Sequence, residues 1–281
     1  MMRTYIQAAL LAIFAAAWNM PSAHAAEIEV DGRARTYELH VPAGIESGAP
    51  LVLAFHGQGG SGKAQALLSG MNATADSHGF VVVYPDGIDR TWHYGGSDID
   101  DLAFVDALIE HLGLTLEIDA QRVYATGMSN GGFFSTFYAC ARPHRVAAIA
   151  PVAASLARLQ RLGCSFAPPL RIQMIAGTED PLVPWDGNAA WLSVPDSVGF
   201  WVWHDNLASE LTVDEWLPDT ATRDGTRTHR LAYGDGEVEL LAVVGGGHTW
   251  PGGIQYLPAS MIGRTSRDFS ASEAIWEFFA R

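Results

Sequence analysis

Basic residues are scarce in this 281-residue chain, and Lys63 is its only lysine. Lysine and arginine number 17 against 31 aspartates and glutamates, which gives a formal net charge of −14 at pH 7. A surface of this sign repels phosphate backbones and anionic lipid, so the composition argues against a nucleic-acid-binding protein. Because 48% of the residues are hydrophobic and 17% charged, the chain can bury a large core and is not a disordered protein.

Long apolar runs are missing except at the N-terminus. A positive start at Met1–Arg3 precedes an apolar stretch from Tyr5 to Trp18, and Ala23 and Ala25 supply the small residues expected before a cleavage site. This three-part plan predicts a secretory signal peptide over residues 1–25 and a mature domain over 26–281 that works outside the cytoplasm, either extracellular or periplasmic. The apolar stretch is shorter than the roughly 20 residues that a membrane-spanning helix needs, and no later segment predicts a membrane span.

Cysteine is as scarce as lysine, with Cys140 and Cys164 as the only pair. An even count in an oxidising compartment favours one disulfide between them. Two separate buried thiols are the alternative, because a sequence does not give the distance between the side chains. Neither cysteine lies in a turn typical of a catalytic nucleophile.

Short apolar runs that end near a glycine recur through the mature chain and predict strands. They are residues 51–57, 81–87, 123–127, 172–177 and 238–245. Such runs, apolar without strict alternation, are typical of parallel strands covered on both faces. The stretch from Ile28 to Pro42 alternates instead and predicts an antiparallel hairpin at the edge of the sheet.

Helical patterns separate these strands. Residues 100–112 place five apolar side chains on one helical face, and Ser270 with Glu273 forms a capping-box pattern before a helix that runs to the C-terminus. Strands that alternate with helices predict a doubly wound, mostly parallel α/β sheet in a single domain. A loop-rich insertion is expected between Trp185 and Thr228.

A turn around Ser129 carries the strongest local signal for chemistry. Gly127-Met-Ser-Asn-Gly131 lies between a predicted strand and a predicted helix over 133–141. A turn tight enough to expose a serine needs small neighbours, as in the nucleophile elbow of serine hydrolases. A plain glycine-rich connection is the alternative.

An activated serine needs a base and a group that orients the base. His248 follows the last predicted strand in a glycine-rich loop, which fits the base, whereas His204 and His229 are expected to be surface or packing residues. Asp180 directly follows the strand that ends near Gly177, which fits the orienting acid. Its neighbours Glu179 and Asp186 are alternatives for the same role.

The oxyanion hole needs two backbone N–H donors. Asn130 follows the serine and is predicted to supply one donor, and the loop with Gly57 and Gln58 after the first buried strand is predicted to supply the other. That loop lacks a phosphate-binding motif, and His56 within it is expected to be a structural hydrogen-bonding residue. No group of residues has metal-ligand spacing, so no metal and no cofactor are predicted.

Taken in order, several segments resemble the esterases of the polyhydroxybutyrate depolymerase family, which is related to feruloyl and acetylxylan esterases. The segments are residues 32–42, 55–57, 100–104, 127–132, 177–184 and 246–253. The resemblance covers nearly the whole mature chain and implies an α/β-hydrolase fold with Ser129, Asp180 and His248 as a catalytic triad. It also favours the Cys140–Cys164 disulfide. Further cysteines that many relatives carry are absent, which implies a more mobile region between Trp185 and Thr228.

The predicted function is therefore a secreted serine ester hydrolase that acts through an acyl-enzyme. Its expected partner is an ester substrate, either hydroxyalkanoate oligomers or feruloyl and acetyl esters of polysaccharide. Trp185 and Trp250 are predicted to line the substrate pocket because they neighbour the acid and the base. The alternative is a noncatalytic, hydrolase-like protein that binds polysaccharide or polyester. The sequence does not predict an oligomeric state.

Overall fold

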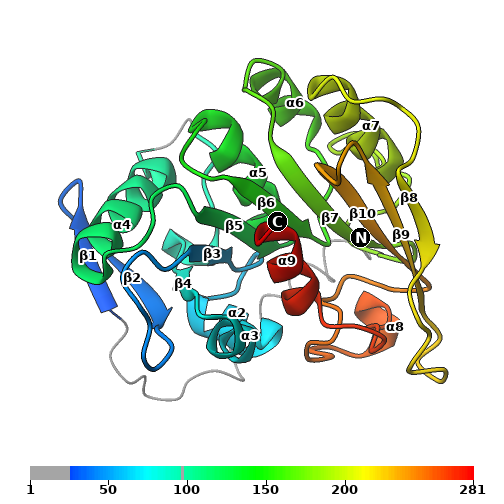
Figure 1. Ribbon diagram of the computed structural model, residues 1–281, viewed down its shortest axis with the longest axis horizontal. Helices are drawn as coiled ribbons and strands as arrows, with labels where there is room; N and C mark the ends of the chain where they lie inside the picture. Colours follow the sequence, from blue (N-terminus) through cyan, green and yellow to red (C-terminus); the bar gives the residue numbers. More distant parts are fainter. Residues whose placement is uncertain (1–25, 96–97) are drawn as a thin grey trace, which may run out of the picture.

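The computed structural model describes residues 26–95 and 98–281, so the predicted signal peptide over residues 1–25 lies outside the described residues. Within the described ranges, one ten-stranded sheet runs through the molecule in the order β1-β2-β4-β3-β5-β6-β7-β10-β9-β8 (Figure 1). The strands are β1 (Ala26–Val30), β2 (Arg33–His40), β3 (Leu51–Phe55), β4 (Val81–Pro85), β5 (Val123–Met128), β6 (Ala148–Val152), β7 (Arg171–Gly177), β8 (Val213–Trp216), β9 (Arg227–Tyr233) and β10 (Val238–Val244). Six neighbouring strands pair in parallel, in the order β4-β3-β5-β6-β7-β10. Antiparallel strands flank them on both sides.

Helices cover both faces of this sheet. They are α2 (Gly62–Ser69), α3 (Met71–His78), α4 (Asp101–Leu116), α5 (Asn130–Ala141), α6 (Arg158–Cys164), α7 (Val194–His204), α8 (Ala259–Ile262) and α9 (Ala271–Phe279), with a short 3₁₀ helix at Ile88–Arg90. The buried hydrophobic residues of α4 and α7, and most of those of α5, belong to one core cluster, and those of α3 and α9 belong to a second.

Strand β3 explains why the central runs are continuously apolar. Leu51, Leu53 and Phe55 lie in the first core cluster, whereas Val52 and Ala54 lie in the second. Because successive side chains point to opposite faces, a strand covered on both sides needs an apolar residue at every position. The predicted doubly wound α/β sheet, its five parallel strands and the antiparallel edge hairpin are confirmed.

Three features differ from the sequence expectations. Strand β6 was not predicted, because it is short, rich in alanine and contains Pro151. Proline has no N–H to donate to the hydrogen bonds between strands. The segment expected to be a loop-rich insertion contains α7 and β8, so the expectation of an irregular region is wrong for those residues. The last helix ends at Phe279 rather than at the C-terminus.

A disulfide links the end of α5 to the end of α6. Cys140 and Cys164 are bonded, with their Cα atoms 4.8 Å apart. The predicted pairing is therefore present, and the alternative of two buried thiols is wrong. The bond closes a separation of 24 residues between two helices that pack on each other.

Replacing both cysteines with alanine is expected to lower the free energy of unfolding by about 3 kcal/mol, because the bond restricts the unfolded chain. Urea unfolding of the wild type and of the Cys140→Ala/Cys164→Ala variant measures this difference. A reducing agent should destabilise the wild type and leave the double variant unchanged. Equal unfolding midpoints for the two proteins would contradict the expectation.

Candidate active site

Ser129 stands at a sharp turn between β5 and α5. Its φ of 56° and ψ of −119° lie outside the regions that non-glycine residues usually adopt. Its N–H donates to the carbonyl of Val152 at 2.9 Å, and its own carbonyl accepts from Phe133 N at 2.9 Å, so the strained conformation is held from both sides. Such strain is tolerated where surrounding structure fixes the backbone, and it clusters at functional sites.

Two glycines permit this turn. A Cβ added to Gly131 would lie 2.2 Å from the carbonyl oxygen of Phe55, and one added to Gly127 would lie 2.7 Å from the same oxygen. Strand β3 therefore packs against the turn so closely that neither position accepts a side chain. The glycines of the sequence motif are explained by backbone packing around Ser129.

Asp180 and His248 form a buried hydrogen-bonded pair. The Nδ1 atom of His248 lies 2.7 Å from Oδ2 of Asp180, and both side chains are less than 5% exposed. The other carboxylate oxygen of Asp180 accepts from the N–H groups of Leu182 and Val183, each at 2.8 Å. Both carboxylate oxygens of Asp180 thus accept hydrogen bonds, and because a carboxylate only accepts, Nδ1 of His248 is the donor in this pair.

The three groups meet at the same edge of the sheet. Ser129 follows β5, Asp180 follows β7 and His248 follows β10, and the carboxyl ends of these parallel strands lie together. The loop that carries His248 crosses directly over the end of β7, where a Cβ on Gly177 would lie 2.3 Å from the carbonyl oxygen of Gly246. Within the described residues, His248 Nε2 makes no hydrogen bond.

Backbone contacts hold the His248 loop in place. His248 N donates to Ile262 O at 2.6 Å, and the hydroxyl of Tyr256 donates to His248 O at 2.9 Å. Burial raises the pKa of Tyr256, so this hydroxyl stays a protonated donor. The sequence did not predict either contact, because both depend on the segment after the His248 loop folding back against it.

Asn130, the first candidate oxyanion donor, is clamped by the segment before α4. Its Oδ1 accepts from Trp92 N at 3.0 Å, its Nδ2 donates to the hydroxyl of Tyr94 at 2.6 Å, and that hydroxyl donates to Asn130 O at 2.9 Å. Side chain and carbonyl are therefore both fixed. No sequence pattern predicted these contacts.

The second candidate donor loop borders the serine. A Cβ added to Gly57 would lie 3.6 Å from Ser129 Cβ, which puts the backbone of this loop beside the nucleophile. Gln58 is exposed, and its side chain accepts from the hydroxyl of Thr91 at 2.6 Å. The loop thus borders Ser129 at Gly57, and its part as the second donor stays a prediction.

His56 is a structural residue, as expected. Its Nδ1 contacts Gly57 O at 2.8 Å, and its Nε2 accepts from Gly87 N at 3.0 Å, so the neutral ring donates at one nitrogen and accepts at the other. Burial lowers the pKa of His56, an effect that the bond to Gly57 only partly opposes. A proton on Nε2 would remove the acceptor that Gly87 needs.

We therefore expect His56 to make the free energy of unfolding fall as the pH is lowered. Below pH about 6.5 the unfolded chain binds a proton there and the folded chain does not, so stability falls by up to about 1.4 kcal/mol for each pH unit. The loss begins as the pH drops through the unfolded value and ends at the lowered folded value. Urea unfolding at pH 7.5 and 5.5 should show a smaller acid loss in His56→Gln than in the wild type. His144→Asn, which alters an exposed histidine, should keep the wild-type loss.

A buried ion pair supports the segment that clamps Asn130. Arg35 and Asp101 are 2.5 Å apart with side chains no more than 3% exposed, and the Arg35 guanidinium lies 3.8 Å from the ring centre of Phe104. The second carboxylate oxygen of Asp101 accepts from His93 N at 2.8 Å, next to Trp92 and Tyr94. Neither partner was singled out from the sequence, because 66 residues separate them.

The tryptophans do not all lie where the sequence suggested. Trp250 is fully buried in the second core cluster, with its indole N–H donating to Ser272 at 3.2 Å, so its ring is not available to a substrate. Trp185 is half-buried against the first core cluster, and its place in the substrate pocket stays a prediction. Trp191, which the sequence did not single out, packs on Phe133 one turn after Ser129.

The alternatives for the orienting acid lie elsewhere. Glu179 is 62% exposed and faces Arg264 at 3.8 Å, and Asp186 is exposed. Neither lies against His248 as Asp180 does. Among residues 26–95 and 98–281, no group of three His, Cys, Asp or Glu side chains is arranged to hold a metal ion. The same ranges include no helix with the length and apolar character needed to cross a bilayer.

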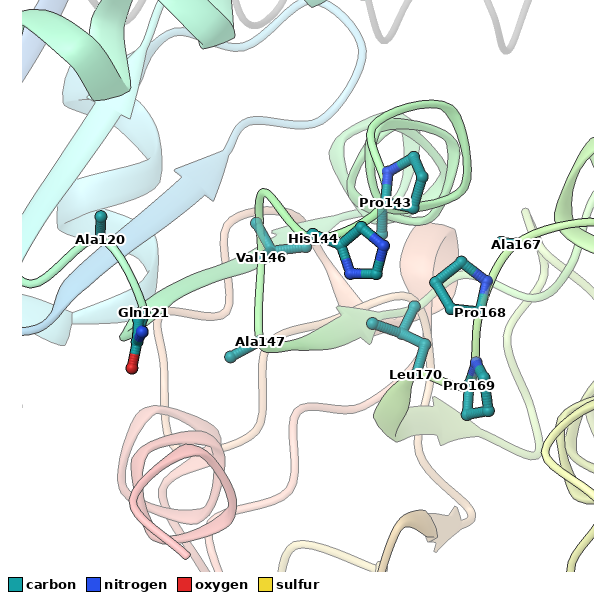
Figure 2. Close-up of a pocket in the computed structure, with 11 residues that line it drawn as sticks. Ala120, Gln121, Pro143, His144, Val146, Ala147, Ala167, Pro168, Pro169 and Leu170 are labelled. Atoms are coloured by element: carbon teal, nitrogen blue, oxygen red, sulfur yellow. The ribbon is translucent and has the colours of Figure 1, made fainter.

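A cavity of about 390 Å³ lies at the amino ends of the parallel strands, opposite the ends that carry Ser129, Asp180 and His248. Its walls come from the segments that precede β5, β6 and β7, and Figure 2 shows Pro143 and His144 facing Pro168 and Leu170 across it. Because these strands are parallel, their amino ends lie away from Ser129, Asp180 and His248. The cavity is separate from the candidate active site.

This sheet, with a strained serine after a central strand and a buried Asp–His pair at the same edge, defines an α/β hydrolase. Acetyl xylan esterase from Aspergillus awamori has the same fold, with a TM-score of 0.59 at 16% identity over 88% of this chain and 94% of that one. A fluorophosphonate-binding serine hydrolase of Staphylococcus aureus, FphF, matches with a TM-score of 0.51 at 9% identity, over 57% of this chain and 80% of that one.

Sequence comparison narrows the class to one family. Residues 35–156 match the family described as Esterase PHB depolymerase. NocK of Nocardia uniformis subsp. tsuyamanensis, whose esterase activity is itself inferred, is 31% identical over 90% of this chain and 81% of its own length. Feruloyl esterase C of Emericella nidulans is 30% identical over 54% of this chain and 57% of its own length. The chain belongs to the PHB depolymerase family of esterases, and it is a carboxylic-ester hydrolase.

Proposed function

We propose that Ser129 is the nucleophile of this ester hydrolase, with His248 as the general base and Asp180 as the group that orients it. The observation that carries the proposal is the buried 2.7 Å contact between His248 Nδ1 and Asp180 Oδ2, at the sheet edge where Ser129 stands. A buried carboxylate in this position stabilises the imidazolium that forms when the histidine takes a proton.

The reaction proceeds in two steps. Oγ of Ser129 attacks the ester carbonyl carbon while His248 Nε2 takes the hydroxyl proton, and His248 then gives that proton to the departing alcohol. Water next attacks the acyl-enzyme, His248 again takes the proton, and the carboxylic acid leaves as Ser129 recovers its hydrogen. Each proton removed from a nucleophile is returned to a leaving group, so the histidine ends each half-reaction neutral.

The negative oxygen of each tetrahedral intermediate needs two donors. The N–H of Asn130, at the amino end of α5, is the first, and the backbone of Gly57 or Gln58 supplies the second. The amino end of a helix favours negative charge, and donors fixed before the reaction cost no reorganisation. The clamp on the Asn130 side chain and the closeness of Gly57 to Ser129 support this assignment.

The relatives support two candidate classes of substrate. Poly(3-hydroxyalkanoate) depolymerase C of Paucimonas lemoignei is 32% identical over 41% of this chain and 30% of its own length, and the feruloyl esterase described above is the other relative used. Hydroxyalkanoate oligomers and feruloyl or acetyl esters of polysaccharide are the candidates. Trp185 remains a candidate for the wall of the pocket.

We also propose that residues 1–25 are removed as a secretory signal and that residues 26–281 are the mature single-domain enzyme. The Cys140–Cys164 disulfide supports an oxidising compartment outside the cytoplasm.

The test is intact-mass analysis of purified protein after exposure to a fluorophosphonate probe. One adduct is expected on the wild type and none on Ser129→Ala. A folded wild type without an adduct would favour the alternative, a noncatalytic protein that binds polysaccharide or polyester. Pull-down with those polymers would then be the deciding measurement.

A further inference from the structure

A third, small apolar cluster lies beside the candidate active site, apart from the two clusters that form the main core. Its buried members are Phe133, Ala154 and Val183, and the half-buried Trp191 packs against them. None of these side chains has a role in the chemistry proposed above. Their position therefore raises the question of what they contact when substrate is bound.

The cluster connects the nucleophile to the acid. Phe133 lies one helical turn after Ser129, whose carbonyl accepts from Phe133 N at 2.9 Å. Val183 lies in the loop that carries Asp180, and its N–H donates to the Asp180 carboxylate at 2.8 Å. Ala154 belongs to the same cluster and packs against the serine turn, since a Cβ on Gly132 would lie 2.8 Å from Ala154 Cβ. The third apolar cluster thus begins within one helical turn of Ser129.

Trp191 is a half-buried member of the cluster, and several contacts hold it in place. Its ring stacks on Phe133 with centroids 5.5 Å apart and planes 21° apart. Its backbone pairs with Ala157, and its N–H donates to the side chain of Asn188 at 3.1 Å, which closes a tight turn. A flat aromatic surface fixed in this way costs little conformational entropy when a ligand binds.

The alcohol side of an ester must lie near His248, which returns its proton. The acyl side extends from the other side of the carbonyl carbon. The apolar group within one turn of Ser129 is Phe133, with Trp191 stacked on it. Stacked aromatic faces favour another flat ring over a flexible aliphatic chain. We propose that Trp191 is a specificity-determining residue that receives the acyl group of the substrate and favours planar, aromatic acyl groups. This inference rests on the proposed function of Ser129.

The test compares two methyl esters that share the alcohol and differ in the acid, one of 4-hydroxy-3-methoxycinnamic acid and one of 3-hydroxybutyric acid. Trp191→Ala should lose about tenfold or more of kcat/KM on the aromatic ester and less than about threefold on the aliphatic one. Trp191→Phe, which keeps a ring, should stay within about threefold of the wild type on both esters. Trp203→Ala removes an exposed tryptophan, 67% accessible on α7, and should match the wild type on both.

Fluorophosphonate labelling of each variant separates this inference from the proposed function. Variants that label like the wild type have an intact Ser129 site. Equal losses on the two esters in labelled Trp191→Ala, or a labelled wild type with no preference for the aromatic ester, would overturn the role of Trp191 alone. A wild type that neither labels nor hydrolyses either ester would overturn the proposed function, and the inference with it.

Discussion

Ser129→Ala is expected to lower kcat/KM on a soluble ester such as p-nitrophenyl acetate by ~10⁴-fold or more, because the acyl-enzyme can no longer form. The backbone of the turn should survive, since alanine meets the same strain at φ 56° as serine does and the packing of Gly127 and Gly131 is untouched. Circular dichroism and the unfolding midpoint should therefore match those of the wild type.

Two further variants sharpen that measurement. Ser77→Ala removes an exposed hydroxyl on α3 and should keep full activity. Asp180→Asn should also be severely impaired, yet adding it to Ser129→Ala should reduce activity little further, because the residues of a triad act as a unit. Residual activity of Ser129→Ala within tenfold of the wild type would exclude Ser129 as the nucleophile.

Asp101→Asn is expected to lower the free energy of unfolding by about 3–5 kcal/mol, because it leaves the charge of Arg35 buried without a partner. Arg35 is only 4% exposed, and no other carboxylate contacts it among the described residues. Urea unfolding monitored by tryptophan fluorescence measures the loss. Activity should fall as well, since Asp101 also holds His93 beside the clamp on Asn130.

Asp98→Asn is the matched control for that prediction. Asp98 pairs with Arg33 at 2.9 Å, but the two side chains are 84% and 45% exposed. An exposed pair contributes no more than about 1 kcal/mol. If the two variants lose similar stability, the burial of the Arg35–Asp101 pair does not have the energetic weight assigned to it.

The sequence predicted those parts of the molecule that depend on local pattern. Continuous apolar runs identify strands buried on both faces, and the order of strands was enough to bring Ser129, Asp180 and His248 to one edge. Their catalytic roles stay predictions. Strand β6 was missed because Pro151 and small residues weaken its pattern, although the tertiary structure on both sides supports it.

Contacts between distant segments were beyond the reach of the sequence. Trp250 follows His248 closely in the chain, yet its ring turns into the core, whereas Trp191 reaches the serine turn by stacking on Phe133. Nearness to His248 in the sequence was therefore a poor guide to where the ring of Trp250 lies. The same holds for Arg35 and Asp101, whose pairing depends on the fold bringing β2 against α4.

The parallel centre of the sheet gives the molecule two ends with separate uses. The candidate reactive groups all emerge at one end, while the turns at 120–121 and 143–147 emerge at the other. A tether attached to either turn would hold the protein on a solid support with its reactive end facing the liquid. Grafted or fused sequences at that far end would likewise leave the path of the substrate unobstructed.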